Sequence, residues 1–175
     1  MLKKKSIPAA YPLFFVAFFA LTSTARDIFI KKSNELIIYN TPGLSNVGVR
    51  NGKILNLFSD SSIVTSDVRK HCATLGLEIK HKVLNNGYHL ITTGREKILI
   101  TNRLNNDILK DLNPGIVIIT SRDPVIERDL YPGNSCRAIV VSSGVRSGFL
   151  PLHPGDTALC TVHYVKKSGA FVRRL

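Results

Sequence analysis

Beyond residue 35, the apolar residues of this chain lie in short runs separated by Gly, Pro, Asn and Ser. Some runs alternate with polar residues and others are continuously apolar, and both patterns are typical of β-strands when turn residues bound them. The first half of the chain shows this pattern repeatedly. We therefore expect strands at 36–39, 47–50, 53–58, 77–84, 88–93 and 97–101.

Two of these strand pairs are expected to be hairpins. Asn51-Gly52 separates 47–50 from 53–58. Asn-Gly is the strongest short hairpin signal, because a type I′ turn needs positive φ at both central residues. We therefore predict a type I′ turn with Asn51 and Gly52 at its centre, and a second hairpin around 94–96.

The second half of the chain alternates apolar runs with helical patterns. The runs 116–119 and 138–141 carry no polar residue, as expected for interior strands covered on both faces. Gly and Pro delimit the helices, and a Pro in the first turn favours a start at Asp123-Pro124. We expect helices at 65–75, at 105–112 and from 123, and a closing hairpin of 157–165 with 170–174.

These elements predict an α/β (mixed α+β) fold. Hairpins come first and strand–helix–strand units follow, which favours mixed sheets with helices outside. We expect two mixed sheets packed face to face, with helices on the outer faces.

The first 25 residues form a separate unit. Three lysines at 3–5 precede an uncharged run at 7–21, and small residues follow at 22–25. This order is typical of a signal peptide, and the run 7–25 also approaches the length of a membrane-spanning helix. Both readings stay open. The lysines favour a cytoplasmic N-terminus with residues 26–175 exported as one domain, although Arg26, Lys31 and Lys32 reduce the charge difference.

Charge points to an anionic partner. The chain has 24 Lys and Arg against 12 Asp and Glu, a net charge of +12. Alternate residues of a strand share a face, so Lys80 and Lys82 project together. A second group lies across the expected closing hairpin. The candidate contacts for the phosphates of single-stranded DNA are therefore Lys80, Lys82, Lys166, Lys167, Arg173 and Arg174. The alternative is a solvated basic surface without a ligand.

Stacking of DNA bases would need exposed aromatic residues. The candidates are Tyr88, Tyr131, Tyr164 and Phe171. Aromatic residues of strands usually face the core, so this support for a DNA surface is thin.

The three cysteines, Cys72, Cys136 and Cys160, are too few for a disulfide scaffold. We expect three reduced, buried thiols; one disulfide with a spare thiol is the alternative for a domain outside the cytoplasm. His71 precedes Cys72, but adjacent helical residues do not face each other, so a catalytic pair is not expected.

The order of segments resembles a known family. The segments 35–43, 46–55, 97–101, 114–119, 137–142 and 162–172 are similar, in order and local pattern, to the C-terminal soluble domain of ComEC-type competence proteins. These are membrane channels that bring single-stranded DNA into bacteria, and this domain has a metallo-β-lactamase-like fold. The ending Ser168-Gly-Ala-Phe-Val172 resembles the short form of Bacteroidetes-type members, in which a final membrane helix precedes the domain. The pore-forming part of that family is absent from this sequence.

The resemblance implies a degenerate, non-catalytic member. Active metallo-β-lactamase-fold relatives need a His-x-His-x-Asp-His cluster to hold two metals. Here the histidines at 71, 81, 89, 153 and 163 are scattered, and the segments 100–102 (Ile-Thr-Asn) and 120–122 (Thr-Ser-Arg) stand where relatives carry an Asp and paired His ligands. We expect no catalytic residues, no metal and no cofactor.

The functional expectation is a domain tethered to the cell membrane through residues 7–25, with its soluble part on the outer side. It would support DNA uptake through contact with single-stranded DNA or with a separate channel-forming subunit. Two alternatives remain: an exported envelope protein that uses the same scaffold only to bind a protein partner, and a non-functional remnant of a split gene.

Overall fold

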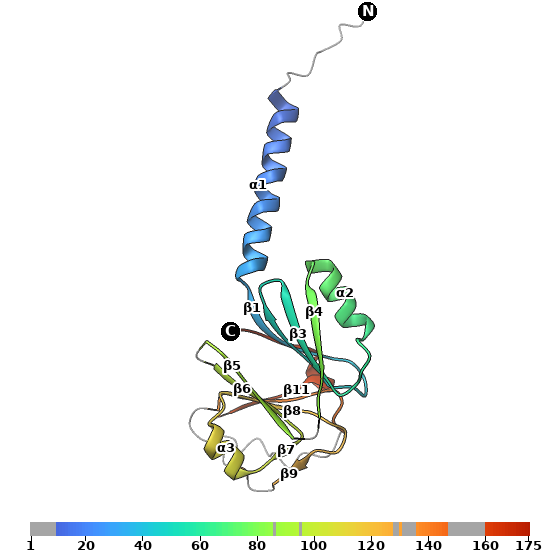
Figure 1. Cartoon of the computed structure of the whole chain (residues 1–175), viewed down its shortest axis with the longest axis vertical. Coiled ribbons are helices and arrows are strands. Elements are labelled where there is room, and N and C mark those ends of the chain that lie inside the picture. Colours follow the sequence, from blue (N-terminus) through green and yellow to red (C-terminus); the bar gives the residue numbers. More distant parts are fainter. Residues whose placement is uncertain (1–9, 86, 95, 128–129, 131–135, 147–159) are drawn as a thin grey trace, which may run out of the picture.

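A computed structural model describes residues 10–85, 87–94, 96–127, 130, 136–146 and 160–175 of the chain. Helix α1 (Ala10–Lys32) projects from the rest of the protein and leads directly into strand β1 (Asn34–Tyr39) (Figure 1). Within the described residues, α1 alone has the length and hydropathy to cross a membrane, with a mean hydropathy of 1.7 over its most apolar window. The helix continues through 26–32, beyond the boundary expected at residue 25, so its last turns belong to the domain.

The first sheet has the strand order β12-β1-β2-β3-β4. Its neighbours are antiparallel except for β3 and β4, which are parallel because helix α2 connects them. The remaining elements of this part are β2 (Asn46–Asn51), β3 (Ile54–Ser59), α2 (Ser66–Leu75), β4 (Glu78–Val83) and β12 (Phe171–Arg174).

The second sheet has the order β11-β10-β8-β6-β5 and is parallel except for the β5–β6 hairpin. Ile116–Ile119 and Ala138–Val141 are adjacent interior strands, as predicted. The elements of this part are β5 (Tyr88–Thr93), β6 (Glu96–Thr101), β7 (Arg103–Leu104), α3 (Asn106–Leu112), β8 (Ile116–Ile119), β9 (Val125–Ile126), β10 (Ala138–Val141), β11 (Thr161–Tyr164) and α4 (Val165–Ser168).

Three apolar clusters hold these elements in four layers. The central cluster lies between the sheets and includes Ile38 of β1, Ile118 of β8 and Val140 of β10. A second cluster packs Val68 and Cys72 of α2 against the outer face of the first sheet. A third places α3, through Leu109, on the outer face of the second sheet. The predicted sandwich of two mixed sheets with outer helices is confirmed.

Both outer helices begin and end where the sequence predicts. The Asn105 side chain caps α3 by accepting a hydrogen bond of 2.9 Å from the Ile108 amide. At the C-terminus of α2, Gly76 adopts φ +62°, a left-handed conformation that favours glycine.

The β2–β3 hairpin corrects the predicted turn. Asn51 pairs with Ile54, so Gly52 and Lys53 form the two-residue loop. Gly52 has φ +60°, and neither Asn51 nor Lys53 has positive φ, which is the pattern of a type II′ turn rather than type I′. The reason is tertiary. The Gly52 amide donates to Ser33 O at 3.0 Å, and a Cβ on Gly52 would lie 2.8 Å from Lys31 O.

The predicted closing hairpin is wrong. Strand β11 pairs with β10 in the second sheet, whereas β12 pairs with β1 in the first. Helix α4 carries the chain from one sheet to the other, with Val165 buried in the central cluster. Each strand therefore pairs with the edge of a different sheet. The predicted helix from Asp123 is also wrong, since Val125–Ile126 form β9 alongside β7.

Candidate functional site

Buried hydroxyl groups gather at one end of the sandwich, where β8 and β10 end below the β1–β2 loop. Ser45 of that loop and Ser142, after β10, are both buried, and their Oγ atoms lie 2.7 Å apart. The amide of Ser121, after β8, donates to Ser45 Oγ at 3.3 Å. These contacts join the two sheets through side chains that are far apart in sequence.

Ser143 ties the same loop to the second sheet. Its Oγ accepts a hydrogen bond from the Thr41 amide at 3.1 Å and lies 2.7 Å from Thr41 O. Gly144 follows at a point of close approach, because a Cβ there would lie 2.4 Å from Ser45 Oγ. The carboxylate of Asp60 completes the group by accepting from the Ser45 amide at 3.1 Å.

These contacts join the β1–β2 loop to the ends of β8 and β10, as a structural cross-link does. We call the group the hydroxyl cluster, and it comprises Thr41, Ser45, Asp60, Ser121, Ser142 and Ser143. A serine nucleophile needs a neighbouring general base, and the partner of Ser142 Oγ is another serine hydroxyl. Ser121 of the cluster lies in the segment 120–122, one of the two segments at which the resemblance leads us to expect metal ligands in active relatives. Across the described residues, no group of three or more His, Cys, Asp or Glu could hold a metal ion.

The described histidines lie on separate elements: His71 on α2, His81 on β4, His89 on β5 and His163 on β11. His153 is outside the described residues. His71 Nδ1 lies 2.7 Å from Tyr39 Oη, and burial lowers the pKa of His71 below its ordinary value, with a smaller effect from the charge of Arg50. Burial also raises the pKa of the Cys72 thiol, so this cysteine is unsuited to act as a thiolate.

The closing hairpin expected to bring Lys166, Lys167, Arg173 and Arg174 into one patch does not form. Lys80 and Lys82 are both exposed on one face of β4, as expected. Strand β4 is the opposite edge of the first sheet from β12, about 19 Å away at the usual strand spacing. Lys166 and Lys167 are exposed on α4, between the two sheets in the chain order.

Arg173 and Arg174 are consecutive on β12 and therefore point to opposite faces. Arg173 donates to Glu96 Oε1 of the second sheet at 3.2 Å. The guanidinium carbon of Arg174 lies 5.7 Å from the ring centroid of Phe29, at the end of α1. The two arginines of β12 therefore contact different parts of the protein and do not form the single patch expected across a closing hairpin.

The aromatic candidates also separate. Tyr88 is 54% exposed on edge strand β5, where a base could stack on it. The Tyr164 ring is covered by Lys167 Nζ, 5.6 Å from its centroid, and Phe171 packs against His163 at 5.2 Å. Tyr131 lies outside the described residues.

Sequence reasoning missed the joint between α1 and the domain. Arg50 on β2 is 3% exposed, and its guanidinium donates to Ile30 O at 3.1 Å, to Gly52 O at 3.0 Å and to Glu35 Oε2 at 3.0 Å. Ile30 O belongs to the last turn of α1, where carbonyl groups lack partners within the helix. No local signal marks Arg50 for burial, because its partners are assembled by the fold.

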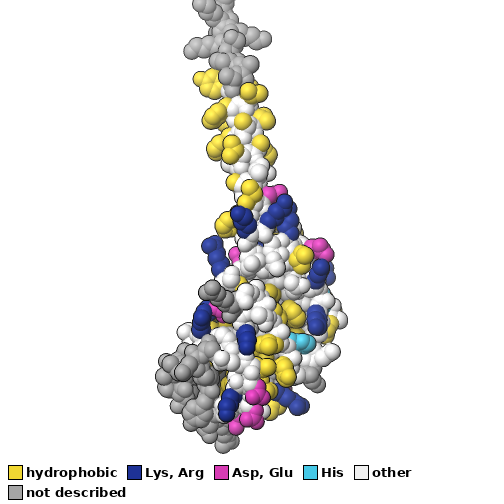
Figure 2. Space-filling model, turned by 60° about the vertical axis from the view of Figure 1, so that its left-hand side comes forward, with side chains coloured by type: hydrophobic (Ala, Val, Ile, Leu, Met, Phe, Trp, Pro, Cys, Tyr) yellow, Lys and Arg dark blue, Asp and Glu magenta, His cyan; other side chains and the backbone are white. Residues whose placement is uncertain are grey.

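Two further contacts fix the same joint. Arg26 donates to Thr74 O of α2 at 3.1 Å, and Lys53 Nζ lies 3.9 Å from Asp27 of α1. Lys and Arg side chains gather at the base of α1 (Figure 2). The helix is therefore held to the domain by its last two turns.

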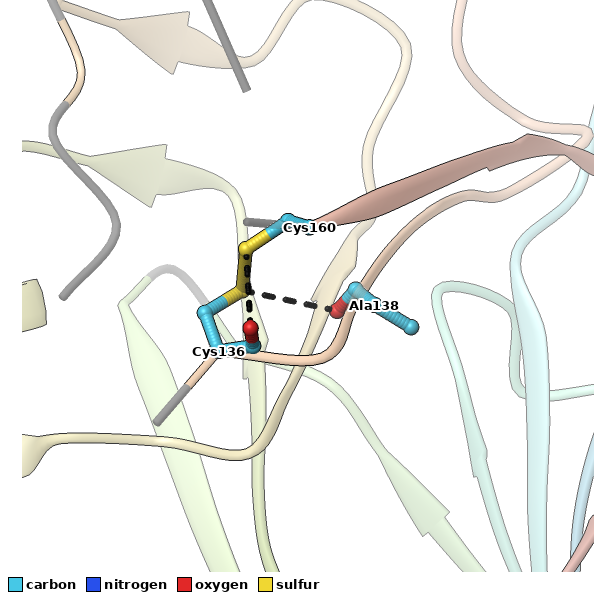
Figure 3. The surroundings of a disulfide bond; sticks show 3 residues. All are labelled: Cys136, Ala138 and Cys160. Carbon is cyan, nitrogen blue, oxygen red and sulfur yellow. Dashed lines mark hydrogen bonds between the residues drawn. A yellow bond between two sulfur atoms is a disulfide. The ribbon is translucent and has the colours of Figure 1, made fainter. Parts of the chain in front are cut away.

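The cysteines correct another expectation. Cys136 and Cys160 form a disulfide, and Cys72 is the free, buried thiol among the three (Figure 3). The bond joins the residues that precede β10 and β11, with Cα atoms 5.7 Å apart. The prediction of three reduced, buried thiols is therefore wrong for Cys136 and Cys160. The parallel pairing of β10 with β11 instead brings these two ends together.

Comparison of the chain with protein-family models, curated proteins and solved structures gives no match.

Proposed function

We propose that this chain is a membrane-anchored, non-catalytic domain that supports DNA uptake, as its resemblance to the C-terminal domain of ComEC-type proteins suggests. The observation that carries the proposal is the joint at the end of α1. An apolar helix continues into strand β1 and is fastened to the domain by Arg50. A chain built in this way keeps its domain at the surface of the membrane that the helix enters.

The soluble part is proposed to lie on the outer side of the cell membrane. The Cys136–Cys160 disulfide supports this side, since disulfides persist in oxidising compartments. The lysines at 3–5 support a cytoplasmic N-terminus. A membrane-impermeant thiol reagent tests the side in a Lys82→Cys variant, because position 82 is exposed on β4. In intact cells the reagent should label this cysteine. Labelling only after cell lysis would place the domain inside.

Retention of α1 needs its own test, because a cleaved signal peptide is the alternative. Mass spectrometry of the chain purified from its native membrane should give the mass of a chain that still carries the N-terminal segment. If washing the membranes with alkaline carbonate released the chain, the chain would not be anchored by α1.

Within this function, exposed Lys80 and Lys82 on β4 are the proposed phosphate contacts. They share one face of an edge strand, and Tyr88 is exposed on β5. Binding to phosphates alone would be independent of sequence and would weaken steeply with salt. Fluorescence anisotropy of labelled single-stranded DNA with the full chain in neutral detergent measures this.

The discriminating variants are K80E/K82E and K166E/K167E, which change the charge equally. We expect the first pair to reduce the slope of log K against log salt by about 1.4, because each lost phosphate contact with a single strand contributes about 0.7. If both double variants reduced the slope equally, DNA binding would depend on the net charge of the protein and not on contacts with Lys80 and Lys82. Absence of binding at about 50 mM salt, where phosphate contacts are strong, would exclude DNA as the ligand.

The non-catalytic part of the proposal rests on the hydroxyl cluster at the position of the relatives' metal ligands. After incubation with zinc or manganese, elemental analysis of the full chain should give less than stoichiometric metal. Bound metal together with chelator-sensitive nuclease activity would overturn this part.

A second candidate is a scaffold that binds a protein partner, either a channel-forming subunit or another envelope protein. The observation in its favour is the exposure of apolar side chains on two edge strands: Val83 of β4 is 42% exposed and Leu90 of β5 is 39% exposed. Edge strands present unpaired backbone groups that another strand can join. Cross-linking in the native membrane from position 88, which is exposed on the same strand, would identify such a partner. Adding Leu90→Lys should abolish the cross-link without unfolding the domain.

A further inference from the structure

A small open groove lies at the joint between α1 and the last strand. It has a volume of about 170 Å³ and is lined by Phe29, Lys32, Ser33, Asn34, Glu35 and Arg174, with Leu175 at its edge. A single water needs only about 10–15 Å³ of such space. The groove therefore has room for a group as large as a phosphate.

The free side-chain charges of the groove are basic. Lys32 and Arg174 are both exposed. Glu35 is the acidic side chain in the lining, and its Oε2 accepts a hydrogen bond of 3.0 Å from Arg50, which neutralises it. An anion that enters the groove thus meets two cationic groups whose charge is not already paired with a carboxylate in the described residues.

Arg174 and Phe29 give the groove a fixed geometry. The guanidinium lies over the Phe29 ring at 5.7 Å, a cation–π contact that restrains an exposed side chain. Guanidinium groups bind phosphate through two parallel hydrogen bonds. The ring itself is 61% exposed, and Ile28 beside it is 50% exposed, so apolar surface borders the cationic groups.

The position of the groove along α1 determines which anion it meets. A hydrocarbon core about 30 Å thick takes about 20 helical residues. The uncharged residues 7–25 approach this length, and Arg26 and Asp27 end the apolar stretch. At a rise of about 1.5 Å per residue, Phe29 and Lys32 lie about 6–10 Å beyond it, so the groove is at the level of the lipid headgroups. The contacts of Arg50 and Arg26 with α1 and α2 keep the domain from turning the groove away from this layer.

We propose that this groove binds the phosphate of an anionic phospholipid. Arg174 and Lys32 contact the phosphate oxygens, and Phe29 lies against the apolar part of the headgroup, where the acyl chains are attached to glycerol. The site orients the domain on the membrane surface. This inference rests on the proposed membrane insertion of α1, but it adds a ligand and a site that DNA uptake does not require.

The test uses the full chain in neutral detergent and short-chain phosphatidylglycerol as the probe. Native mass spectrometry counts bound lipid as its concentration rises, with short-chain phosphatidylcholine as the zwitterionic comparison. We expect preferential retention of one phosphatidylglycerol, and about tenfold weaker affinity in K32Q/R174Q, because hydrogen bonds to charged groups are lost. The matched control is K31Q/K53Q, which removes the same charge at the same end of the domain but outside the groove.

Equal affinity for the two lipids, or equal loss in the two variants, would overturn the site. Inorganic phosphate that displaced the lipid at similar concentrations would show that the groove is a soluble-anion site instead. Circular dichroism of each variant establishes that the domain is folded. Failure of lipid binding would leave the anchoring test by carbonate extraction unaffected, so the two proposals can fail separately.

Discussion

The guanidinium of Arg50, in the middle of the first sheet, donates a hydrogen bond to the carbonyl oxygen of Ile30, in the last turn of α1. The same side chain binds Glu35 and Gly52 O and is almost fully buried. One residue therefore joins the helix, the β2–β3 hairpin and strand β1.

Arg50→Met should destabilise the domain by about 3 kcal/mol, because it leaves the Glu35 carboxylate and two carbonyl groups without their buried partner. Urea unfolding of the full chain in neutral detergent, followed by circular dichroism, measures the loss. The control is Lys53→Met, whose ion pair with Asp27 is exposed and should contribute less than about 1 kcal/mol. Similar losses in both variants would contradict the role of Arg50.

Gly144→Ala should destabilise the domain by roughly 1–3 kcal/mol, because the added methyl group would overlap Ser45 Oγ and the backbone of the β1–β2 loop. Gly76→Ala is the comparison: no atom lies within 4 Å of its Cβ position, so only the positive φ opposes the change, at about 1 kcal/mol. The hydroxyl cluster would not be a tight cross-link if Gly144→Ala proved the milder of the two.

Replacing Val117 or Val140 by Asp should unfold the domain. Both side chains are fully buried, Val117 towards α3 and Val140 between the sheets. An unpaired buried carboxylate costs several kcal/mol, comparable to the whole stability of a domain of this size. Lys166→Asp, on exposed α4, should leave the melting transition in place. Harmless core substitutions would refute the strand assignment.

Removing the disulfide through Cys136→Ser and Cys160→Ser should lower the free energy of unfolding by about 3 kcal/mol, the value expected for a loop of this length. The bond closes a sequence separation of 24 residues. A reducing agent should shift the unfolding midpoint of the wild type and leave that of the double variant unchanged. If the wild type does not respond to reduction, the bond is not formed.

The stability should also fall on acidification. Burial holds the pKa of His71 below its unfolded value near 6.5, so the unfolded state binds the proton more readily. The free energy of unfolding that neutral His71 contributes is fully present above about pH 6.5. It declines as the pH falls towards the pKa of His71 in the folded state, and below that pKa it no longer changes. Urea midpoints between about pH 8 and pH 5 should therefore fall more in the wild type than in His71→Gln. Parallel pH profiles would show that His71 does not couple to folding.

Local pattern was enough to predict most elements and the layered fold. The continuously apolar runs 116–119 and 138–141 predicted interior strands, and Gly76 and Asn105 marked helix ends. These signals depend on neighbours in sequence, where polarity and backbone preference are visible directly.

The errors share a different cause. The signal at Lys167-Ser-Gly169 is compatible with a hairpin or a crossover, and only the open edges beside β10 and β1 determine which one forms. Gly52 is fixed by Lys31 O, and Ser45 meets Ser142 across 97 positions of sequence. Such contacts exist only once the sheets are assembled, so the candidate site was less predictable than the fold.

The pairing of β1 with β12 sets the order in which the protein can be completed during synthesis. Strand β1 leaves the ribosome soon after the apolar helix, yet its neighbour at residues 171–174 follows roughly 130 residues later. At ordinary translation rates this interval is on the order of ten seconds. A nascent chain interrupted before residue 171 would leave the backbone of Leu36 and Ile38 on an open strand edge. Quality-control proteases and holding chaperones recognise such edges, so only chains that reach β12 should accumulate.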